Sequence, residues 1–554
     1  MDKVLGIHGL CHDSGAALIS GDRIVAVSEE RLSRVKHDPE FPVRSINYVL
    51  KACGVRAVND IDVMVFSYVE RSADAISRLI RDRLKYKGRL HYIRHHDAHA
   101  ASAFYVSPFE DAAILVIDGC GSWMDEAETG ASPHYLSTLT WKLREIQSLY
   151  RGDGNHINLI HRTNSAADYS IGAGILYSLG SMILGFGEMG AGKLMALAAY
   201  GGRKPVFKSP FFEDFRAGDI IARGLPGADP MMPDNVELYA RKLFGMKPRR
   251  PGEQITNRHA EFAHFIQKEA EAVMLKLANH LHDITQAENL CVSGGVALNC
   301  LANKLILDNT PFRNLFIQPA ATDTGIPLGC ALHGYHKLLN RPKKFNLDTV
   351  FLGRTYTTGE IEAALDKFKG IKWSSPGNIA VKCARLLSEG KVVGRFTGGC
   401  ELGPRALGNR SILADPRNPK IKDHLDNNVK FRESFRPYAP AVLEEHAREF
   451  FDLKTPSPFM LLAAAVHEDK RPLITAVTHV DGTSRIQTVS VNENPGFYKL
   501  ISEFYKLTGV PLVLNTSMNT AGEPIVETPA DALKMLTSTE LDCLILENVL
   551  VEKK

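Results

Sequence analysis

Positively charged side chains gather in three short, turn-like segments of the C-terminal third of the chain. The segments are GPRALGNRS (403–411), KFRESFRPYAP (430–440) and VDGTSRIQTV (480–489), and they supply Arg405, Lys430, Arg432, Arg436 and Arg485. Arginine offers planar, paired donors that match phosphate and carboxylate oxygens. The polar run LNTSMN (514–519) adds Asn515 and Ser517. Cations held on turns between apolar strands predict a pocket for a small, doubly charged anion.

A second set of residues has the types and spacing of a metal site. If HHDAHAASAF (95–104) is helical, His95 and His99 share one face near the start of that helix. Asp118 ends an apolar strand, and Asp323 lies in the loop PAATDTGIP. Two imidazoles and two carboxylates suit a divalent transition metal, with iron, manganese and zinc all compatible. The neighbouring His96 and Asp97 are ambiguous, because each could support a ligand instead of binding the metal.

Glycine-rich segments predict a nucleotide site in the N-terminal part of the chain. In GGVALN (294–299), Gly294 and Gly295 would let a ligand approach the backbone, and Asn299 follows within the same segment. The helix expected from about Val296 would favour a polar or anionic ligand at its start.

A further glycine-rich segment, GEMGAGKLM (187–195), has the spacing of a phosphate-binding P-loop but not its chemistry. Leu194 stands where a Ser or Thr should hold magnesium, and the preceding segment is typical of a helix. We therefore reject that motif, and keep Glu188 and Lys193 as candidates for ribose and phosphate contacts.

Strands followed by glycine-rich turns would position these side chains. DAAILVIDGCGS (111–122) and ENLCVSGGVALN (288–299) each predict a buried strand that ends in such a turn, the usual place for function in an α/β sheet. A helix is expected near 43–52. Two such sites far apart in sequence favour two related α/β halves, and the Pro-containing segment around 336–349 is the best candidate for a linker.

Long motifs of the chain resemble those of a known family. GPRALGNRS, KFRESFRPYAP and LNTSMNTAGEPIVETP are similar to the C-terminal half of the ATP-dependent O-carbamoyltransferases, which modify nodulation factors, cephamycins and aminoglycosides such as tobramycin. The resemblance extends over nearly the whole chain. It implies an α/β protein with an actin-like (ASKHA) two-lobed domain over 1–345. A YrdC-like domain over 350–554 would form carbamoyl adenylate from ATP and carbamoyl phosphate.

The resemblance also implies roles for individual residues. The four candidate metal ligands match positions that bind iron in the threonylcarbamoyl-transfer protein of tRNA modification, so Fe²⁺ is the expected metal. His12, Asp13 and Lys36 match positions near the reacting carbamoyl group. The family's usual approach to His12 is replaced here by Gly9-Leu10-Cys11, so recognition of the acceptor could differ. Magnesium accompanying ATP is a further expectation.

Composition narrows the class of function. The 554 residues exceed one ordinary core, and the formal net charge of +3 argues against a dedicated nucleic-acid binder. Nine cysteines without a paired motif, and no apolar signal segment, favour a cytoplasmic protein without a membrane anchor. The expected partner is a small-molecule hydroxyl acceptor, and a homodimer is allowed.

Three other functions stay open on the sequence. Threonylcarbamoyl transfer to tRNA would need a basic stripe beside the first cleft. A non-catalytic nucleotide-binding scaffold would need no metal ligands and no second anion pocket. A two-histidine, one-carboxylate oxygenase would share the ligand types but has no use for the nucleotide loops.

Overall fold

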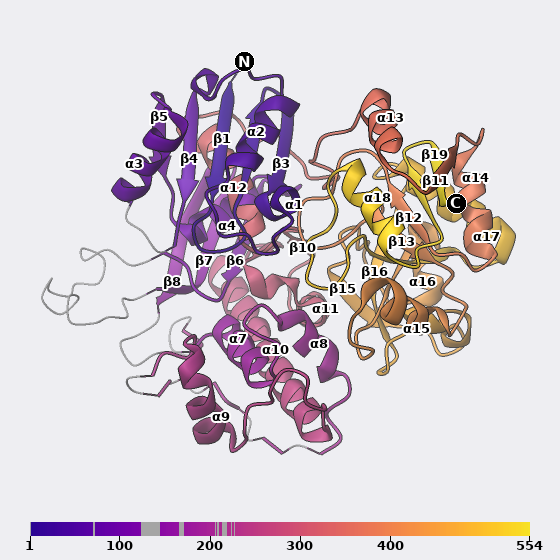
Figure 1. Ribbon diagram of the computed structural model, residues 1–554. Helices are drawn as coiled ribbons and strands as arrows, with labels where there is room; N and C mark the ends of the chain where they lie inside the picture. Colours follow the sequence, from indigo (N-terminus) through magenta and orange to yellow (C-terminus); the bar gives the residue numbers. More distant parts are fainter. Residues whose placement is uncertain are drawn as a thin grey trace, which may run out of the picture. The chain divides into compact units, whose positions relative to one another are not determined.

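The computed structural model describes residues 2–69, 73–122, 144–164, 171–204, 206–207, 210–212, 219–222, 224–225 and 228–554 (Figure 1). The chain forms two compact units, each built from two segments. The first unit comprises Met1–Cys11 and Val58–Asn346, and the second comprises His12–Ala57 and Leu347–Lys554. The first unit ends within the expected linker. The assignment of separate functions to 1–345 and 350–554 stays a prediction.

The first unit contains two groups of parallel strands. β1 (Lys3–His8), β4 (Val63–Ser67) and β5 (Arg89–Tyr92) pair in parallel. A five-stranded sheet has the order β10-β9-β6-β7-β8. Its strands are β6 (Asp111–Ile117), β7 (Glu145–Asp153), β8 (His156–Asn164), β9 (Asn289–Ser293) and β10 (Asn314–Ile317). In that sheet β6, β9 and β10 are parallel, whereas β7 and β8 form an antiparallel hairpin.

Two buried helices form the centre of the first unit. α12 (Ile326–His333) packs on β1 and β4, while α4 (His95–Phe104) packs on β6 and β9, and the two helices contact each other. Gly329 permits this contact, because a Cβ there would lie 1.9 Å from the carbonyl oxygen of Ala98. Gly6 plays the same part on β1, where a Cβ would lie 2.0 Å from the Pro327 carbonyl oxygen. These close approaches fix the elements that carry the candidate metal ligands.

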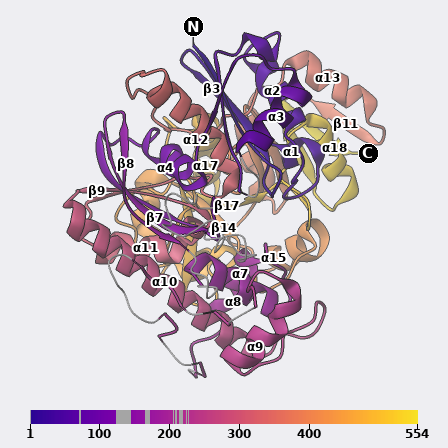
Figure 2. The same ribbon diagram turned by 90° about the vertical axis from the view of Figure 1, so that its left-hand side faces the viewer.

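A helical group completes the first unit. α7 (Ala173–Ile183), α8 (Ala191–Ala198) and α11 (Cys300–Asn309) contact the long α10 (Asn257–Thr285), and α9 (Val236–Phe244) packs on α7 (Figures 1 and 2). A capping box of Thr256 and His259 begins α10. α3 (Ala73–Leu84) lies between β4 and β5 in the chain. The segment before the rejected P-loop, α7, is helical as predicted.

The early segment of the second unit is a hairpin followed by two helices. β2 (Gly15–Ser20) and β3 (Arg23–Ser28) pair antiparallel, and α1 (Glu29–Ser33) and α2 (Val43–Ala52) follow. Side chains of this segment bind the C-terminal residues: Arg31 donates to the Gly403 carbonyl oxygen at 2.6 Å, and Arg34 donates to that of Ile525 at 2.8 Å. The hairpin and its helices are therefore part of the second unit.

A nine-stranded mixed sheet forms the rest of the second unit, in the order β11-β19-β18-β12-β13-β17-β14-β16-β15. The strands are β11 (Ile371–Ser374), β12 (Val393–Phe396), β13 (Arg410–Ala414), β14 (Ala439–Leu443), β15 (Leu462–Ala465), β16 (Thr483–Val489), β17 (Leu512–Ser517), β18 (Cys543–Leu546) and β19 (Val549–Lys553). The helices are α13 (Thr358–Lys367), α14 (Ile379–Ser388), α15 (Ile421–Leu425), α16 (Ala447–Phe450), α17 (Pro495–Thr508) and α18 (Pro529–Ser538). α14 packs on α17, and α13 on α18.

These sheets confirm the predicted α/β class. The chain order of elements also repeats: β1, the hairpin β2–β3, then β4 and β5 parallel to β1, followed by β6, the hairpin β7–β8, then β9 and β10 parallel to β6. This repetition agrees with two related halves of an actin-like fold. Among the described residues, no helix has both the length and the apolar character needed to cross a bilayer.

Candidate metal centre and anion pocket

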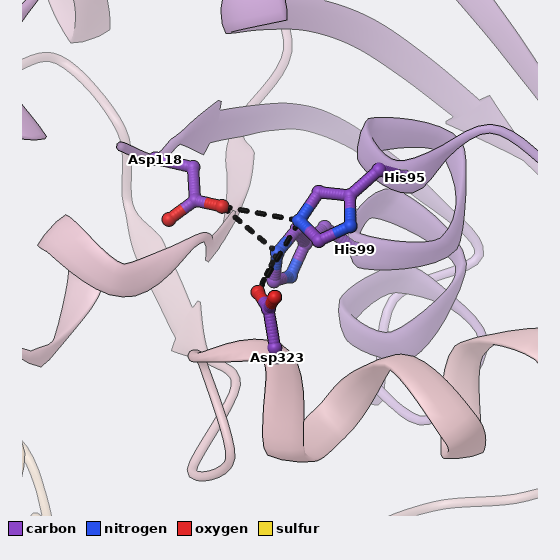
Figure 3. A group of neighbouring side chains, drawn as sticks. All are labelled: His95, His99, Asp118 and Asp323. Atoms are coloured by element: carbon purple, nitrogen blue, oxygen red, sulfur yellow. Dashed lines mark hydrogen bonds and ion pairs between the residues drawn. The ribbon is translucent and has the colours of Figure 1, made fainter. Parts of the chain in front are cut away.

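The four predicted metal ligands lie together in the first unit. His95 and His99 project from the first turns of α4, Asp118 follows β6, and Asp323 lies just before α12 (Figure 3). One ligand atom from each residue lies within 4.8 Å of every other. The Nε2 atom of His95 is 3.1 Å from Asp118 Oδ2 and 3.2 Å from Asp323 Oδ1, and that of His99 is 3.5 Å from both oxygens. The structure thus brings together residues that are far apart in sequence.

The surroundings of this group suit a bound cation. His95 and His99 are fully buried, and among the described atoms none forms a hydrogen bond with His99 Nε2. His99 Nδ1 lies 3.2 Å from Ser293 Oγ, a partner of the kind that orients a ligating imidazole. The Gly295 amide donates to Asp118 Oδ1 at 3.0 Å and leaves Oδ2 facing the histidines. Buried imidazole nitrogens and carboxylate oxygens aimed at one point fit a divalent transition metal.

The electrostatics of the group point the same way. Burial disfavours the charged form of His95, but the carboxylates of Asp323 and Asp118 outweigh it and raise the pKa of His95 well above its usual value. Burial likewise disfavours the charged form of Asp118, but the adjacent His95 and His99 rings outweigh it and hold the pKa of Asp118 well below its usual value. The site therefore stabilises positive charge.

The two ambiguous neighbours lie in a different cluster. His96 Nδ1 is 2.8 Å from Ser148 Oγ, and burial together with the charge of His95 lowers the pKa of His96 well below its usual value. Asp97 accepts hydrogen bonds from Tyr150 and Arg162. Neither side chain is part of the four-residue group.

Two residues near this group were not singled out from sequence. His8 Nε2 lies 3.3 Å from the second oxygen of Asp323, Oδ2, and 3.5 Å from Cys11 Sγ. Burial lowers the pKa of His8, but Cys11 and Asp323 outweigh burial and raise it to about 9. His8 ends a strand and Cys11 lies in the turn after it, so no spacing rule marks them.

Some of the residues predicted to bind a nucleotide in the first unit have structural roles, whereas others lie in glycine-rich segments at its surface. Gly294 has φ 90°, and a Cβ there would lie 2.1 Å from the Ile117 carbonyl oxygen, so glycine is required for packing on β6. Asn299 begins α11 by accepting from Ala302, and it also bonds Gln267. Glu188 is exposed, and Lys193 Nζ lies 5.9 Å from the centre of the Phe186 ring. Nucleotide binding by these residues stays a prediction.

His12 and Asp13 form a pair in the second unit. His12 Nδ1 lies 3.4 Å from Asp13 Oδ2, and His37 Nδ1 lies 2.7 Å from Asp13 Oδ1. Burial raises the pKa of Asp13, but the hydrogen bonds from His12 and His37 outweigh it and lower the pKa to about 2. Asp13 and His37 have φ of 52° and 56°, a costly backbone region for residues other than glycine. A buried carboxylate thus orients a His12 side chain that is 38% exposed.

Some of the predicted cations of the C-terminal segments lie close enough to the buried Lys430 to act on its charge. Among the described residues its ammonium group donates to neutral oxygens, including Asn519 O at 2.6 Å, Asn519 Oδ1 at 2.7 Å and Ser517 Oγ at 3.2 Å. Burial, followed by the charges of Arg432, Arg436 and Lys36, lowers the pKa of Lys430 well below its usual value. Lys36, from the early segment of the second unit, is therefore close enough to Lys430 to act on its charge.

The arginines of these segments differ in how far their charge is neutralised. Burial, Arg432 and, more weakly, Arg485 lower the pKa of Arg436 to about 10, so these guanidinium groups repel one another. Arg432 is partly neutralised by Asp426 at 3.0 Å and stacks on Tyr438. Arg405 is half-buried in its turn. Like charges gathered around the buried Lys430 are costly unless an anion joins them, so the arrangement favours binding of a small anion.

Two polar residues of the motifs have partners that sequence does not reveal. Arg410 is fully buried in β13, donates to the carbonyl oxygens of Thr397 and Gly398, and lies over the Phe396 ring, so it shapes the turn. Asn515 donates to Ala406 O and Gln487 Oε1, while its buried Oδ1 has no hydrogen-bond partner among the described residues. That oxygen is available to an amide or amino group of a ligand.

Family models match most of the chain. The model for the carbamoyltransferase N-terminus covers residues 3–78 and 68–332, and the model for the carbamoyltransferase C-terminus covers residues 384–553. The chain belongs to the carbamoyltransferase family. This membership supports transferase activity and confirms the predicted resemblance.

Nodulation proteins of Sinorhizobium fredii and Bradyrhizobium diazoefficiens are similar to 83–98% of the chain. Nodulation protein NolNO of Sinorhizobium fredii is 35% identical over 98% of this chain and 79% of its own length. Nodulation protein NolO of Bradyrhizobium diazoefficiens is 34% identical over 83% of this chain and 79% of its own length. Nodulation protein U of Sinorhizobium fredii is 29% identical over 96% of each chain.

We expect His12→Asn to lose most of the transfer step. A positioned general base contributes on the order of 10²–10⁴-fold in rate, and asparagine cannot accept the proton. Because Asp13 is held by His37 as well, the turn should keep its shape. The measurement is carbamoyl transfer to an acceptor alongside first-turnover pyrophosphate release. Retained pyrophosphate release with lost transfer would support the role, whereas near-normal transfer would leave His12 a structural turn residue.

Proposed function

We propose that this carbamoyltransferase-family protein is an ATP-dependent O-carbamoyltransferase that acts on a small-molecule hydroxyl. Carbamoyl phosphate, ATP and water would give carbamoyl adenylate, phosphate and pyrophosphate. The acceptor oxygen would then bond to the carbamoyl carbon as the bond from that carbon to the AMP oxygen breaks. The products are the carbamate ester and AMP.

The cation cluster around Lys430 carries this proposal. Carbamoyl phosphate and the triphosphate bring several negative charges into one place. Each hydrogen bond to a charged group is worth roughly 1.5–3 kcal/mol, so several cations are needed to hold them. Arg405, Arg436 and Arg485 are assigned to the anions, and Lys36 joins them from the early segment of the second unit. Asn515 Oδ1 is assigned to an amino group of a bound ligand, and Ser517 holds Lys430 in place.

In the first unit, His95, His99, Asp118 and Asp323 would hold a divalent metal, with Fe²⁺ expected. A bound metal of this kind polarises phosphoryl or carbonyl oxygens and stabilises developing negative charge. Gly294 and Gly295 would let the adenylate approach the backbone, with Glu188 and Lys193 assigned to its ribose and phosphate.

For the transfer step, His12 is assigned as the general base that takes the proton from the acceptor hydroxyl. Its Nδ1 faces Asp13, and Nε2 is assigned as the atom that receives the hydroxyl proton. Asp13 would hold the ring and stabilise its charged form. Binding to nucleic acid is not part of the proposal, because a net charge of +3 offers no general attraction to a phosphate backbone.

The test is mass spectrometry of candidate hydroxyl acceptors incubated with the protein, ATP and carbamoyl phosphate. A mass gain of one carbamoyl group, dependent on both substrates, is the expected result. Pyrophosphate release should likewise require carbamoyl phosphate. Pyrophosphate release that ignores carbamoyl phosphate would exclude the two-step reaction. Modification of tRNA under the same conditions would instead indicate that the protein transfers a threonylcarbamoyl-type group to tRNA.

A further inference from the structure

A second group of metal-ligand side chains lies against the four-residue metal centre. It consists of His8, Cys11 and Asp323, whose ligand atoms all lie within 4.8 Å of one another. His8 is fully buried and Cys11 is half-buried. Asp323 takes part in both groups through different oxygens: Oδ1 faces His95 at 3.2 Å, and Oδ2 faces His8 at 3.3 Å.

The hydrogen bonding of His8 determines which of its nitrogens faces the cluster. His8 Nδ1 lies 2.7 Å from the carbonyl oxygen of Ser67, which can only accept, so Nδ1 carries the hydrogen. In the neutral ring the lone pair is then on Nε2, the atom that faces Cys11 Sγ and Asp323 Oδ2. A positive charge, either a proton on Nε2 or a metal ion, therefore lies between Nε2 and the Asp323 carboxylate, and the test below distinguishes the two. An Nδ1–H bound to a backbone carbonyl is also the usual support of a metal-ligating histidine.

The distances between these atoms fit a tetrahedral cation. With Zn–S of about 2.3 Å and Zn–N and Zn–O of about 2.0–2.1 Å, tetrahedral angles separate sulfur from nitrogen by roughly 3.6 Å and nitrogen from oxygen by roughly 3.3 Å. The structure has His8 Nε2 at 3.5 Å from Cys11 Sγ and at 3.3 Å from Asp323 Oδ2.

We propose that His8, Cys11 and Asp323 bind a second divalent cation, of the zinc type, with Asp323 bridging it to the metal of the four-residue centre. A thiolate beside imidazole and carboxylate ligands selects zinc over magnesium or calcium. Enzymes with two metal ions hold them about 3.5–4 Å apart, a span that one bridging carboxylate can provide. Three protein ligands leave one coordination position open to water or an oxygen ligand.

The test uses Co²⁺ alone as the probe on chelator-stripped protein. Wild type is expected to bind two equivalents and to show the near-ultraviolet charge-transfer absorption of a thiolate–cobalt bond. Cys11→Ser should bind one equivalent and lose that absorption. His8→Asn, which keeps a donor for the Ser67 carbonyl, should also lose one equivalent. Cys53→Ser, at a half-buried cysteine away from the cluster, is the matched control and should behave as wild type.

A third variant separates this site from the four-residue centre. His99→Ala should lose one equivalent yet keep the thiolate absorption, because its remaining metal would lie at Cys11. A wild-type protein that binds one equivalent without thiolate absorption would overturn the proposal and leave only a proton between His8 and Asp323. Two equivalents bound by Cys11→Ser would overturn it as well. The readout is metal binding, so its outcome is independent of whether carbamoyl transfer is observed.

Discussion

Replacing Lys430 with methionine is expected to lower carbamoyl-phosphate-dependent pyrophosphate release by about 10- to 100-fold. Removing a charge-assisted hydrogen bond costs roughly 1.5–3 kcal/mol, and each 1.4 kcal/mol is a factor of ten. Methionine keeps the length and apolar stem of lysine but cannot bind an anion. Lys430 is buried and surrounded by Arg432, Arg436 and Lys36, so substrate anions would compensate the charge repulsion at this point. The measurement is the initial rate of pyrophosphate release at several carbamoyl phosphate concentrations.

Lys420→Met is the matched control for this change. Lys420 is exposed before α15 in the same unit, so its replacement should leave the rate unchanged. The Lys430 variant is also expected to unfold at a lower temperature, because methionine leaves the Ser517 and Asn519 oxygens without their donor. The rates are therefore compared at a temperature at which circular dichroism shows both proteins folded. A Lys430 variant with wild-type rate and wild-type dependence on carbamoyl phosphate would place the anion elsewhere.

The elements that carry the candidate metal site could be predicted from sequence because their signals are local. The i,i+4 histidines lie on a helix that begins at His95, and Asp118 follows a strand of continuous apolar residues. Asp323 joins them only through tertiary packing. The close approach of α12 to α4 requires glycine at position 329, because a Cβ there would clash with the Ala98 carbonyl oxygen.

The position of the early segment could not be predicted from sequence. β2, β3, α1 and α2 have ordinary strand and helix patterns, yet they pack with residues more than three hundred positions away. Arg31 and Arg34 achieve this by donating to the carbonyl oxygens of Gly403 and Ile525. A backbone carbonyl oxygen is present at every residue, so side-chain types do not reveal which one an arginine will bind. The influence of Lys36 on Lys430 depends in turn on this packing, so it could not be predicted either.

Motif residues also divide in ways that their types do not reveal. Arg405 and Arg410 occur in the same nine-residue motif. The guanidinium group of Arg410, however, donates hydrogen bonds to backbone carbonyl oxygens and stacks on an aromatic ring. Glu401 organises that turn by accepting from the amides of Leu407, Asn409 and Arg410. A charge in a motif can thus serve the shape of a turn, and only its surroundings show which role it has.

The double substitution His95→Ala, His99→Ala is expected to remove one equivalent of metal per chain and to lower carbamoyl transfer by about 10³-fold or more. Both imidazoles are buried and face Asp118 and Asp323, so their loss leaves two carboxylates that repel each other and cannot complete the site. A metal that polarises a reacting oxygen supplies several kcal/mol, and each 1.36 kcal/mol is tenfold in rate. Elemental analysis and acceptor carbamoylation measure the two effects.

The double variant also tests whether the two units work separately. Pyrophosphate release should persist, because Lys430 and its neighbours belong to the second unit, whereas both histidines belong to the first. His156→Ala, at an exposed position on β8, is the control and should change neither metal content nor transfer. Full metal content in the double variant would contradict the four-residue site. Loss of pyrophosphate release together with transfer, in a variant that still folds, would instead make adenylate formation depend on the metal centre.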